Sequence, residues 1–418
     1  MRARWLLAVP TAIATLCSCS SSSQPSDSAL DAGGGQDESD STTGTSSGSS
    51  GNTASGGGSG SASSGGSSSG GLSDDASSGS TSDDASSDGS SDDGAGSNGT
   101  ADSGAAVGPC DLYASGGTPC VAAHSTARAL YGAYSGKLYQ VKRASDKTTK
   151  DIDVLAPGGF ADSAAQDAFC AGTTCTISII YDQSPKGNHL RSAPAGGAKS
   201  TPDNEASATA LKLTIGGHTV YAVHIPAGVG YRNDTTSGIA AGDEAETEYM
   251  VTSGTYYNGG CCFDYGNAET NNNDDNAGTM EAVYFGNSTG WGKGAGNGPW
   301  VMADLENGLF AGSSFAANPK DTPLTSAYVT AMVKGRSGGF ALKGGNAQSG
   351  TLTTIYDGAR PSGYNPMKKQ GAIILGIGGD NSNSAQGNFF EGVMTSGNAP
   401  DATDDAVQAN IVAAGYGH

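Results

Sequence analysis

Basic residues are scarce in this 418-residue chain, which has 21 lysines and arginines against 41 aspartates and glutamates. No basic patch is recognisable, and this argues against a nucleic-acid partner. Between residues 20 and 107 there is no lysine, arginine or aromatic residue, and 13 of the acidic residues lie there. Ser, Gly, Asp, Ala and Thr make up almost all of this segment. Because it cannot bury enough apolar surface to offset its chain entropy, we expect residues 20–107 to be a disordered linker.

The amino terminus lacks an apolar run long enough for a conventional membrane-spanning helix. Two arginines precede an apolar run over residues 5–16, which is typical of a signal peptide. Leu16 stands three residues before Cys19, as in a bacterial lipoprotein box, although Cys17 inside that box is atypical. We therefore expect a signal peptide over residues 1–19, lipidation of Cys19 and an extracellular or cell-surface protein that meets the membrane only through this anchor. Ordinary cleavage and secretion is the alternative.

Residues 108–418 make up the part of the chain that can fold, and we expect one domain because no second linker interrupts it. Six of the eight cysteines lie there, and an even number in an exported chain indicates disulfides. Their spacing favours the pairs Cys110–Cys120 and Cys170–Cys175. The adjacent Cys261 and Cys262 can bond each other or reach elsewhere. A metal site is the weaker interpretation.

Short runs with strand character, separated by glycine-rich turns, recur through this region and are typical of a β-sandwich or jelly roll. They cover residues 138–142, 176–181, 219–224, 281–285, 328–333, 351–356 and 372–376. We therefore expect an all-β, concanavalin-like sandwich with few short helices. Helices are predicted at residues 126–134 and 402–414. The second has Asp401 as its N-cap and Val407, Ile411 and Val412 on one side.

Several motif matches carry little weight. Ser288 lies in a G-x-S-x-G sequence, but the glycine-rich residues after it cannot form the helix that a hydrolase nucleophile elbow requires. The glycines of residues 292–298 also precede no helix and do not predict a phosphate-binding loop. Residues 271–276 are rich in Asn and Asp and could bind calcium, but they lack EF-hand spacing, so a solvated turn is expected. The five scattered histidines are interpreted as structural.

Two acidic positions lie in apolar surroundings. Residues 299–310, P-W-V-M-A-D-L-E-N-G-L-F, predict a buried strand on which Asp304 and Glu306 share one face. Residues 372–379 predict another buried strand that ends at a glycine pair, with Asp380 at its tip. Glycoside hydrolysis needs two carboxyl groups, one to attack the anomeric carbon or activate water and one to protonate the leaving oxygen. The sequence offers Glu306 and Asp380 as such a pair.

Four longer motifs are specific enough to compare with a known family. They are N-G-G-C-C-F-D-Y-G-N-A-E-T (258–270), G-N-G-P-W-V-M-A-D-L-E-N-G-L-F (296–310), S-G-Y-N-P-M-K-K-Q-G-A-I-I-L-G-I-G-G-D-N-S-N (362–383) and F-E-G-V-M-T-S-G (390–397). From about Gly108 to the carboxyl terminus the sequence resembles the catalytic domain of glycoside hydrolase family 54, whose members are secreted α-L-arabinofuranosidases.

The resemblance implies a retaining, exo-acting enzyme that removes terminal α-L-arabinofuranosyl residues from arabinan, arabinoxylan or oligosaccharides. We also expect a monomer that requires no cofactor or metal. The family's nucleophile falls on Glu306 and its acid/base on Asp380. We therefore expect Glu306 to be ionised and Asp380 to start protonated. The substrate-contacting positions fall on Asp304, Asn307, Trp291, Gly379 and the pair Cys261 and Cys262, for which the resemblance implies a vicinal disulfide that packs against the sugar.

Family members commonly carry a C-terminal arabinose-binding module, whereas this sequence stops at His418. We therefore expect no second sugar site to add affinity for bulky polymers. Two alternatives to the arabinofuranosidase remain. One is a lectin-like surface protein that binds arabinose without turnover, and the other is a related β-xylosidase or galactofuranosidase.

Overall fold

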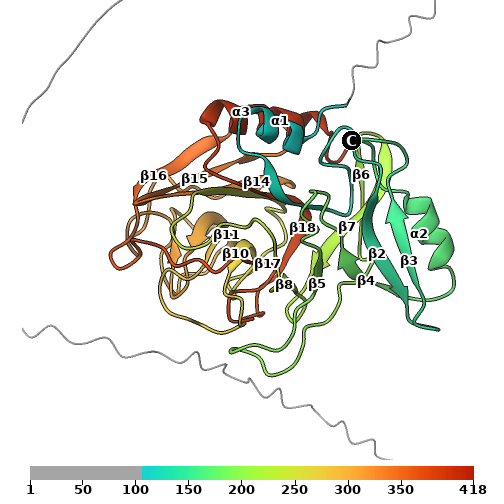
Figure 1. The fold of residues 1–418 in the computed structure, drawn as a ribbon, viewed down its shortest axis with the longest axis horizontal. Coiled ribbons are helices and arrows are strands. Elements are labelled where there is room, and N and C mark those ends of the chain that lie inside the picture. Colours follow the sequence, from blue (N-terminus) through green and yellow to red (C-terminus); the bar gives the residue numbers. More distant parts are fainter. Residues whose placement is uncertain (1–105) are drawn as a thin grey trace, which may run out of the picture. The chain divides into compact units, whose positions relative to one another are not determined.

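Two antiparallel β-sheets form most of the folded region in a computed structural model that describes residues 106–418 (Figure 1). The predicted signal peptide, the lipidation at Cys19 and nearly all of the predicted linker lie outside the described residues. Among the described residues, no helix has the length and apolar character needed to cross a membrane. The helices are α1 (Pro109–Ser115), α2 (Ser163–Phe169) and α3 (Asp401–Ala413).

One sheet has the strand order β16-β15-β14-β9-β18-β7-β6, with β1 also paired to β18, and the other has the order β13-β12-β11-β10-β17-β8-β5-β4-β2-β3. The strands are β1 (Cys120–Ser125), β2 (Lys137–Arg143), β3 (Thr149–Asp153), β4 (Cys175–Ile180), β5 (Leu190–Ser192), β6 (Leu211–Ile215), β7 (His218–Ile225), β8 (Tyr231–Asn233), β9 (Glu246–Thr252), β10 (Asp264–Ala268), β11 (Glu281–Gly286), β12 (Trp300–Asp304), β13 (Leu309–Phe310), β14 (Val329–Arg336), β15 (Gly339–Asn346), β16 (Thr353–Ala359), β17 (Ala372–Leu375) and β18 (Gly387–Thr395).

The strands β10, β12 and β17 are buried on both faces, and the two-residue period of a strand assigns their side chains to different cores. Val301 and Ala303 of β12 belong to the main core, whereas Trp300 and Met302 belong to a separate cluster. The same alternation divides β17, where Ile373 joins the main core and its neighbours join another cluster. The ten-stranded sheet therefore has an inner face that packs in the sandwich and a covered outer face, on which the candidate site is built.

The predicted all-β sandwich is confirmed, and each of the seven predicted strands is present with ends that differ by at most three residues. The helix predicted at residues 126–134 is wrong. The Ala129 amide there donates to the carbonyl of Gly159 instead of to the preceding turn, and the Arg128 guanidinium is 2.5 Å from the buried Glu391 carboxylate. These long-range partners hold the segment in an irregular conformation.

The C-terminal helix is present as α3, which lies beside α1 in Figure 1. Its N-cap is Pro400 and not Asp401, which is the first helical residue. The Asp401 carboxylate instead accepts hydrogen bonds from two lysines on β14 and β15. Val407 and Ile411 are buried as expected, whereas Val412 is only partly buried.

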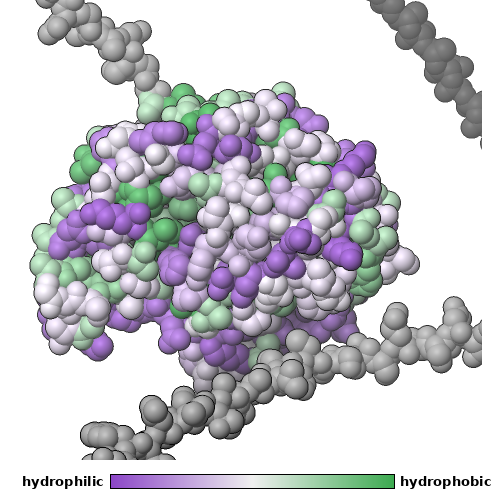
Figure 2. All heavy atoms as spheres, turned by 180° about the vertical axis from the view of Figure 1, so that it is seen from behind, coloured by the Kyte–Doolittle hydropathy of each residue, from purple (hydrophilic) through white to green (hydrophobic). Residues whose placement is uncertain are grey.

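Polar and apolar side chains are interspersed on the molecular face that Figure 2 shows, where the apolar patches are small. The large hydrophobic residues exposed within residues 106–418 are Val107, Leu155 and Phe315. Two disulfides, Cys110–Cys120 and Cys170–Cys175, close loops with sequence separations of 10 and 5.

Candidate active site

The two acids predicted near residue 305 meet through a turn and not through a shared strand face. Strand β12 ends at Asp304, and Glu306 has φ 62°, a left-handed conformation that breaks the strand period. Asn307 follows with φ 57°. The Glu306 amide then donates to Asp304 Oδ1 over 3.1 Å. The prediction of one strand carrying both side chains is therefore wrong, yet the turn keeps the two carboxyl groups close together and nearly buried.

Asp380 lies in a turn some way beyond its strand. Strand β17 ends at Leu375, and Gly376 has φ 77°, so the predicted strand stops earlier than the glycine pair. The Ser382 amide donates to Asp380 Oδ1 over 2.9 Å, which fixes the carboxylate within its own turn. Because the chain folds back after β17, the Asp380 turn reaches the acids that follow β12.

Gly379 is the point of contact between the two predicted catalytic segments. A Cβ placed on it would lie 2.7 Å from Glu306 Oε2 and still closer to Glu269 Oε2. Both carboxyl groups therefore press against the backbone immediately before Asp380. Only glycine provides this space, which explains why the position lacks a side chain.

Cys261 and Cys262 form a vicinal disulfide, and the peptide bond between them is cis. Their sulfur atoms and a carboxylate oxygen of Asp304 lie within 4.8 Å of one another. Both sulfurs are engaged in the disulfide, so they cannot serve as thiolate metal ligands. Trp291 is partly buried and packs against the same apolar cluster. The structure thus brings the predicted disulfide, tryptophan and acids to one side of the sheet.

Asn307 is exposed, and its side chain bonds a neighbouring turn. Its amide donates to Asp274 Oδ1 over 2.9 Å, and its carbonyl accepts from the Tyr364 hydroxyl over 3.1 Å. Asp274 belongs to residues 271–276, where side chains bond neighbouring backbone amides as in a solvated turn. This turn therefore supports the Glu306 loop through Asn307.

Two buried carboxyl groups that sequence reasoning missed accompany the predicted acids. Asp264 of β10 is completely buried and lies beside Asp304, and Glu269, just after β10, is completely buried and lies beside Glu306. The motif at residues 258–270 contains both acids. Only the pairing of β10 with β11 and of β11 with β12 brings them next to the acids of a distant segment.

Burial and mutual repulsion raise the pKa of these carboxyl groups. Burial raises the pKa of Asp304 to about 7 and, together with the charges of Glu269 and Asp304, raises that of Glu306 to about 11. Burial also raises the pKa of Glu269, and it holds that of Asp264 well above its usual range. These directions favour a proton held within the Glu269–Glu306 pair of the unliganded site, so the expected ionisation of Glu306 stays a prediction.

One guanidinium group connects the acid-bearing segments. Arg232 of β8 has a completely buried side chain, and its Nη1 donates to the Gly379 carbonyl over 2.6 Å and to Asn381 Oδ1 over 3.1 Å. Its Nη2 donates to the backbone carbonyl of Glu269. The planar fork of an arginine can hold several acceptors in fixed directions. Arg232 thereby joins the turn of Asp380 to the segment that carries Glu269.

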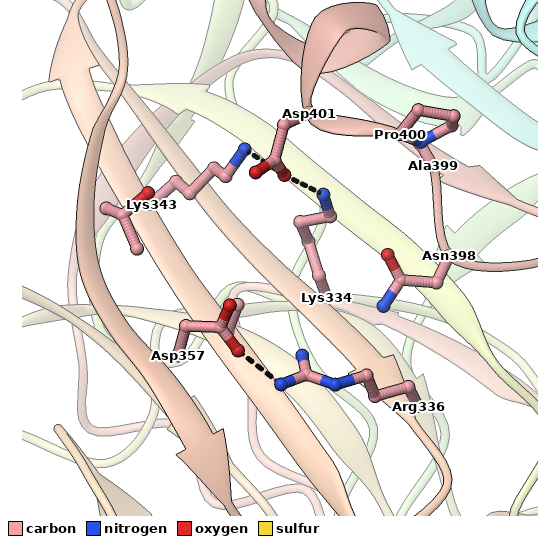
Figure 3. Close-up of a pocket in the computed structure, with 10 residues that line it drawn as sticks. Lys334, Arg336, Lys343, Asp357, Asn398, Ala399, Pro400 and Asp401 are labelled. Carbon is pink, nitrogen blue, oxygen red and sulfur yellow. Dashed lines mark hydrogen bonds and ion pairs between the residues drawn. The ribbon is translucent and has the colours of Figure 1, made fainter.

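A hollow of about 370 Å³ lies on the other sheet and does not share residues with this site (Figure 3). Lys334 and Lys343 converge on Asp401 there, at 2.8 and 2.7 Å, and Arg336 pairs with Asp357. Its cations are therefore matched by carboxylates of the same wall. None of the residues predicted to be catalytic lines this hollow.

Comparison with known proteins identifies the family. A family model described as "Alpha-L-arabinofuranosidase B, catalytic" matches residues 109–417. The chain belongs to this family, glycoside hydrolase family 54. The arabinofuranosidase B family includes a probable α-L-arabinofuranosidase B of Aspergillus terreus that is 62% identical over 313 residues, which are 73% of this chain and 62% of that protein. An "Arabinofuranosidase/B-xylosidase" of Trichoderma koningii has the same identity and coverage.

Solved structures of the family support the same relationship. A family 54 α-L-arabinofuranosidase soaked with a cyclic sulfate inhibitor has a TM-score of 0.73 and 58% identity, covering 74% of this chain and 66% of that one. An arabinofuranosidase complexed with arabinofuranosyl-α-1,2-xylobiose has a TM-score of 0.73 and 57% identity over the same shares. The present chain thus spans about 62% of the length of the curated relatives that it matches.

Proposed function

We propose that this protein is a retaining, exo-acting α-L-arabinofuranosidase. The observation that carries the proposal is the meeting of Glu306 with the Gly379–Asp380 backbone beside a vicinal disulfide, on the covered outer face of the sheet. Glycoside hydrolysis requires two carboxyl groups in different protonation states. A cluster of buried carboxyl groups that retains protons can provide both states within one site.

The reaction follows from these roles. A Glu306 carboxylate oxygen attacks C1 of the arabinofuranoside while the Asp380 carboxyl gives its proton to the departing oxygen. The C1–O bond to the leaving group breaks as the ester bond to Glu306 forms. Asp380, now a carboxylate, removes a proton from water, which attacks C1 and releases arabinose and the free Glu306 carboxylate. Two displacements at C1 retain the anomeric configuration.

Neutral sugar is the substrate class that this site favours. Four buried carboxyl groups with raised pKa values gather at this site, and Arg232 contacts backbone and amide oxygens there and not these carboxylates. A substrate with its own carboxylate would be repelled, whereas arabinofuranosyl groups offer hydroxyls and an apolar ring face. The disulfide and Trp291 supply an apolar surface for that ring. The names of relatives support arabinofuranosyl groups on arabinan, arabinoxylan or their oligosaccharides as substrates.

The first test is hydrolysis by the full chain of p-nitrophenyl α-L-arabinofuranoside and of an arabinoxylan oligosaccharide. Glu306→Gln should abolish release of both products, because an amide cannot form the ester intermediate. Asp380→Asn should lower the rate of hydrolysis of the oligosaccharide about 10²- to 10⁴-fold. The rate of the first displacement should fall less with the nitrophenyl substrate, because its leaving group needs little protonation.

Asp357→Asn, which alters a carboxylate outside the site, is the matched control and should keep wild-type rates. Proton NMR of the first product should show the α-anomer. Wild-type turnover in the Glu306→Gln variant would overturn the nucleophile, and the β-anomer as first product would overturn retention. Arabinose binding without turnover by folded wild-type protein would favour the lectin-like alternative.

A related β-xylosidase activity is the second candidate, because the Trichoderma koningii relative is named for both activities. Comparing kcat/KM for p-nitrophenyl β-D-xyloside with that for the arabinofuranoside decides between them. A ratio above one would assign the chain to the xylosidase.

Cell-surface attachment through Cys19 is a separate part of the proposal, supported by the sequence of residues 1–19. The full chain with Cys19→Ser should leave the membrane fraction and enter the medium. Membrane attachment that survives this change would overturn lipidation at Cys19.

A further inference from the structure

Within residues 106–418, no backbone amide, hydroxyl or side-chain N–H group donates a hydrogen bond to the Glu306 carboxyl. Its own amide donates to Asp304, and the carboxyl is almost fully buried. A buried carboxylate without a donor is costly, since it loses the hydrogen bonds that water would give. A nucleophile in this position needs a hydrogen-bond donor that stabilises the carboxylate but leaves it negatively charged and free to attack.

Glu269 is the group that meets this need. Its side chain is fully buried, and the Thr279 hydroxyl lies 2.5 Å from its Oε1. Its Oε2 has no N–H or O–H partner among the described residues. Both this oxygen and Glu306 Oε2 lie against the same Cβ position of Gly379. The unpartnered oxygen of Glu269 is therefore aimed at the Glu306 carboxyl.

The charges around the pair require that it holds a proton. Asp304 and Asp274 face Glu306 from the end of β12 and from the 271–276 turn, and Asp380 faces it from the turn after β17. The Arg232 guanidinium reaches the Glu269 backbone but pairs with the Asp234 carboxylate. Two adjacent anions without a paired cation are unfavourable in a buried site. Burial raises the pKa of both glutamates, and the neighbouring carboxylates raise that of Glu306 further.

We propose that Glu269 is the positioning residue of the nucleophile, and that in the reactive form its protonated carboxyl donates a hydrogen bond from Oε2 to the Glu306 carboxylate. The single proton of the pair can lie on either carboxyl. Only the form that carries it on Glu269 leaves Glu306 free to attack C1. The proton stays on Glu269 during the attack, so it neither enters nor leaves the overall reaction. This inference rests on the proposed function and adds a residue to it.

Two substitutions of Glu269 separate positioning from packing. Glu269→Gln places an N–H donor in the same space and cannot ionise, so kcat should stay within about tenfold of wild type. Glu269→Leu has a similar volume and no donor, so kcat should fall by about 10²-fold or more while KM changes less. Circular dichroism and the thermal midpoint check that each variant is folded.

A pH profile supplies a readout that packing would not move. With 2,4-dinitrophenyl α-L-arabinofuranoside the leaving group needs no acid, so the alkaline limb of kcat/KM reports loss of the Glu269 proton and not loss of the Asp380 proton. The wild-type rate should fall on this limb, and the Glu269→Gln rate should stay level. This second test does not need the leucine variant to fold.

Turnover by wild type and its loss in Glu306→Gln are measured first in the same assay. If wild type shows no turnover, the proposed function is refuted, and the role of Glu269 is a separate question. If that turnover is present, equal losses in the glutamine and leucine variants would overturn the proposal. So would superimposable alkaline limbs for wild type and Glu269→Gln. The proposal is supported if Glu269→Gln keeps its rate while Glu269→Leu loses it, and if kcat/KM of Glu269→Gln stays level at alkaline pH.

Discussion

Replacing Gly379 with alanine should damage catalysis more than stability. The added Cβ would lie 2.7 Å from Glu306 Oε2, 3.0 Å from Met280 Sδ and nearer still to Glu269 Oε2, whereas real Cβ contacts essentially never fall below 3.0 Å. The Glu306 oxygen must therefore retreat by several tenths of an ångström, and the Glu269 oxygen by more. A misplacement of about 1 Å costs roughly 10²-fold in rate, so we expect kcat to fall about 10- to 100-fold.

The stability cost of the same change is the ordinary cost of overpacking, about 1–3 kcal/mol, which lowers the thermal midpoint by a few degrees. The assay is kcat for p-nitrophenyl α-L-arabinofuranoside beside a denaturation curve. Gly312→Ala is the matched control, because its Cβ would meet only Tyr356 ring carbons at 3.6 and 3.7 Å. If Gly379→Ala keeps kcat within threefold of that control, the argument that Gly379 leaves room for the Glu269–Glu306 pair is refuted.

Two further substitutions test the supports of the site and its surroundings. Arg232→Lys should lower kcat at least tenfold with little change in fold, because one ammonium cannot replace the forked contacts to Gly379 and Asn381; unchanged kcat would show that these contacts do not position the Asp380 turn. Burial raises the pKa of Asp321 from 3.8 to about 8, so the folded state keeps a proton that the unfolded chain releases, and the free energy of unfolding falls with rising pH between those values. Asp321→Asn should remove up to about 1.4 kcal/mol of that fall per pH unit, measured as denaturant midpoints from pH 5 to 8, and identical slopes would contradict the burial argument.

The strands were predictable because apolar and β-branched runs bounded by glycine depend on local sequence, and β4, β7, β11 and β14 lie close to their predicted positions. Helix α3 was predictable for the same reason. The segment at residues 126–134 was not, because its conformation depends on Gly159 and Glu391, which are distant in sequence. Local pattern predicts an element well only where the element's hydrogen bonds are themselves local or follow a regular ladder.

The site shows the same division. Asp304, Glu306 and Asp380 could be found because each stands beside an apolar run, but the left-handed turn at Glu306 could not, since few non-glycine residues adopt it. Glu269 and Asp264 carry no local signal of their own. Only the pairing of β10 with β11 and of β11 with β12 turns them into neighbours of the predicted acids.

Strain and charge at this site occur together, which is expected where function and not stability determines the local structure. The predicted nucleophile Glu306 has positive φ, and so do Asn307 and Asn381, which directly follow the two predicted catalytic residues. The buried carboxyl pairs beside them, Asp264–Asp304 and Glu269–Glu306, have too few cations to balance their charge. The inner faces of the same strands pack in the main core, so the sandwich can sustain both costs on its outer face. A period of two along β12 thus lets alternate residues stabilise the fold and build the site.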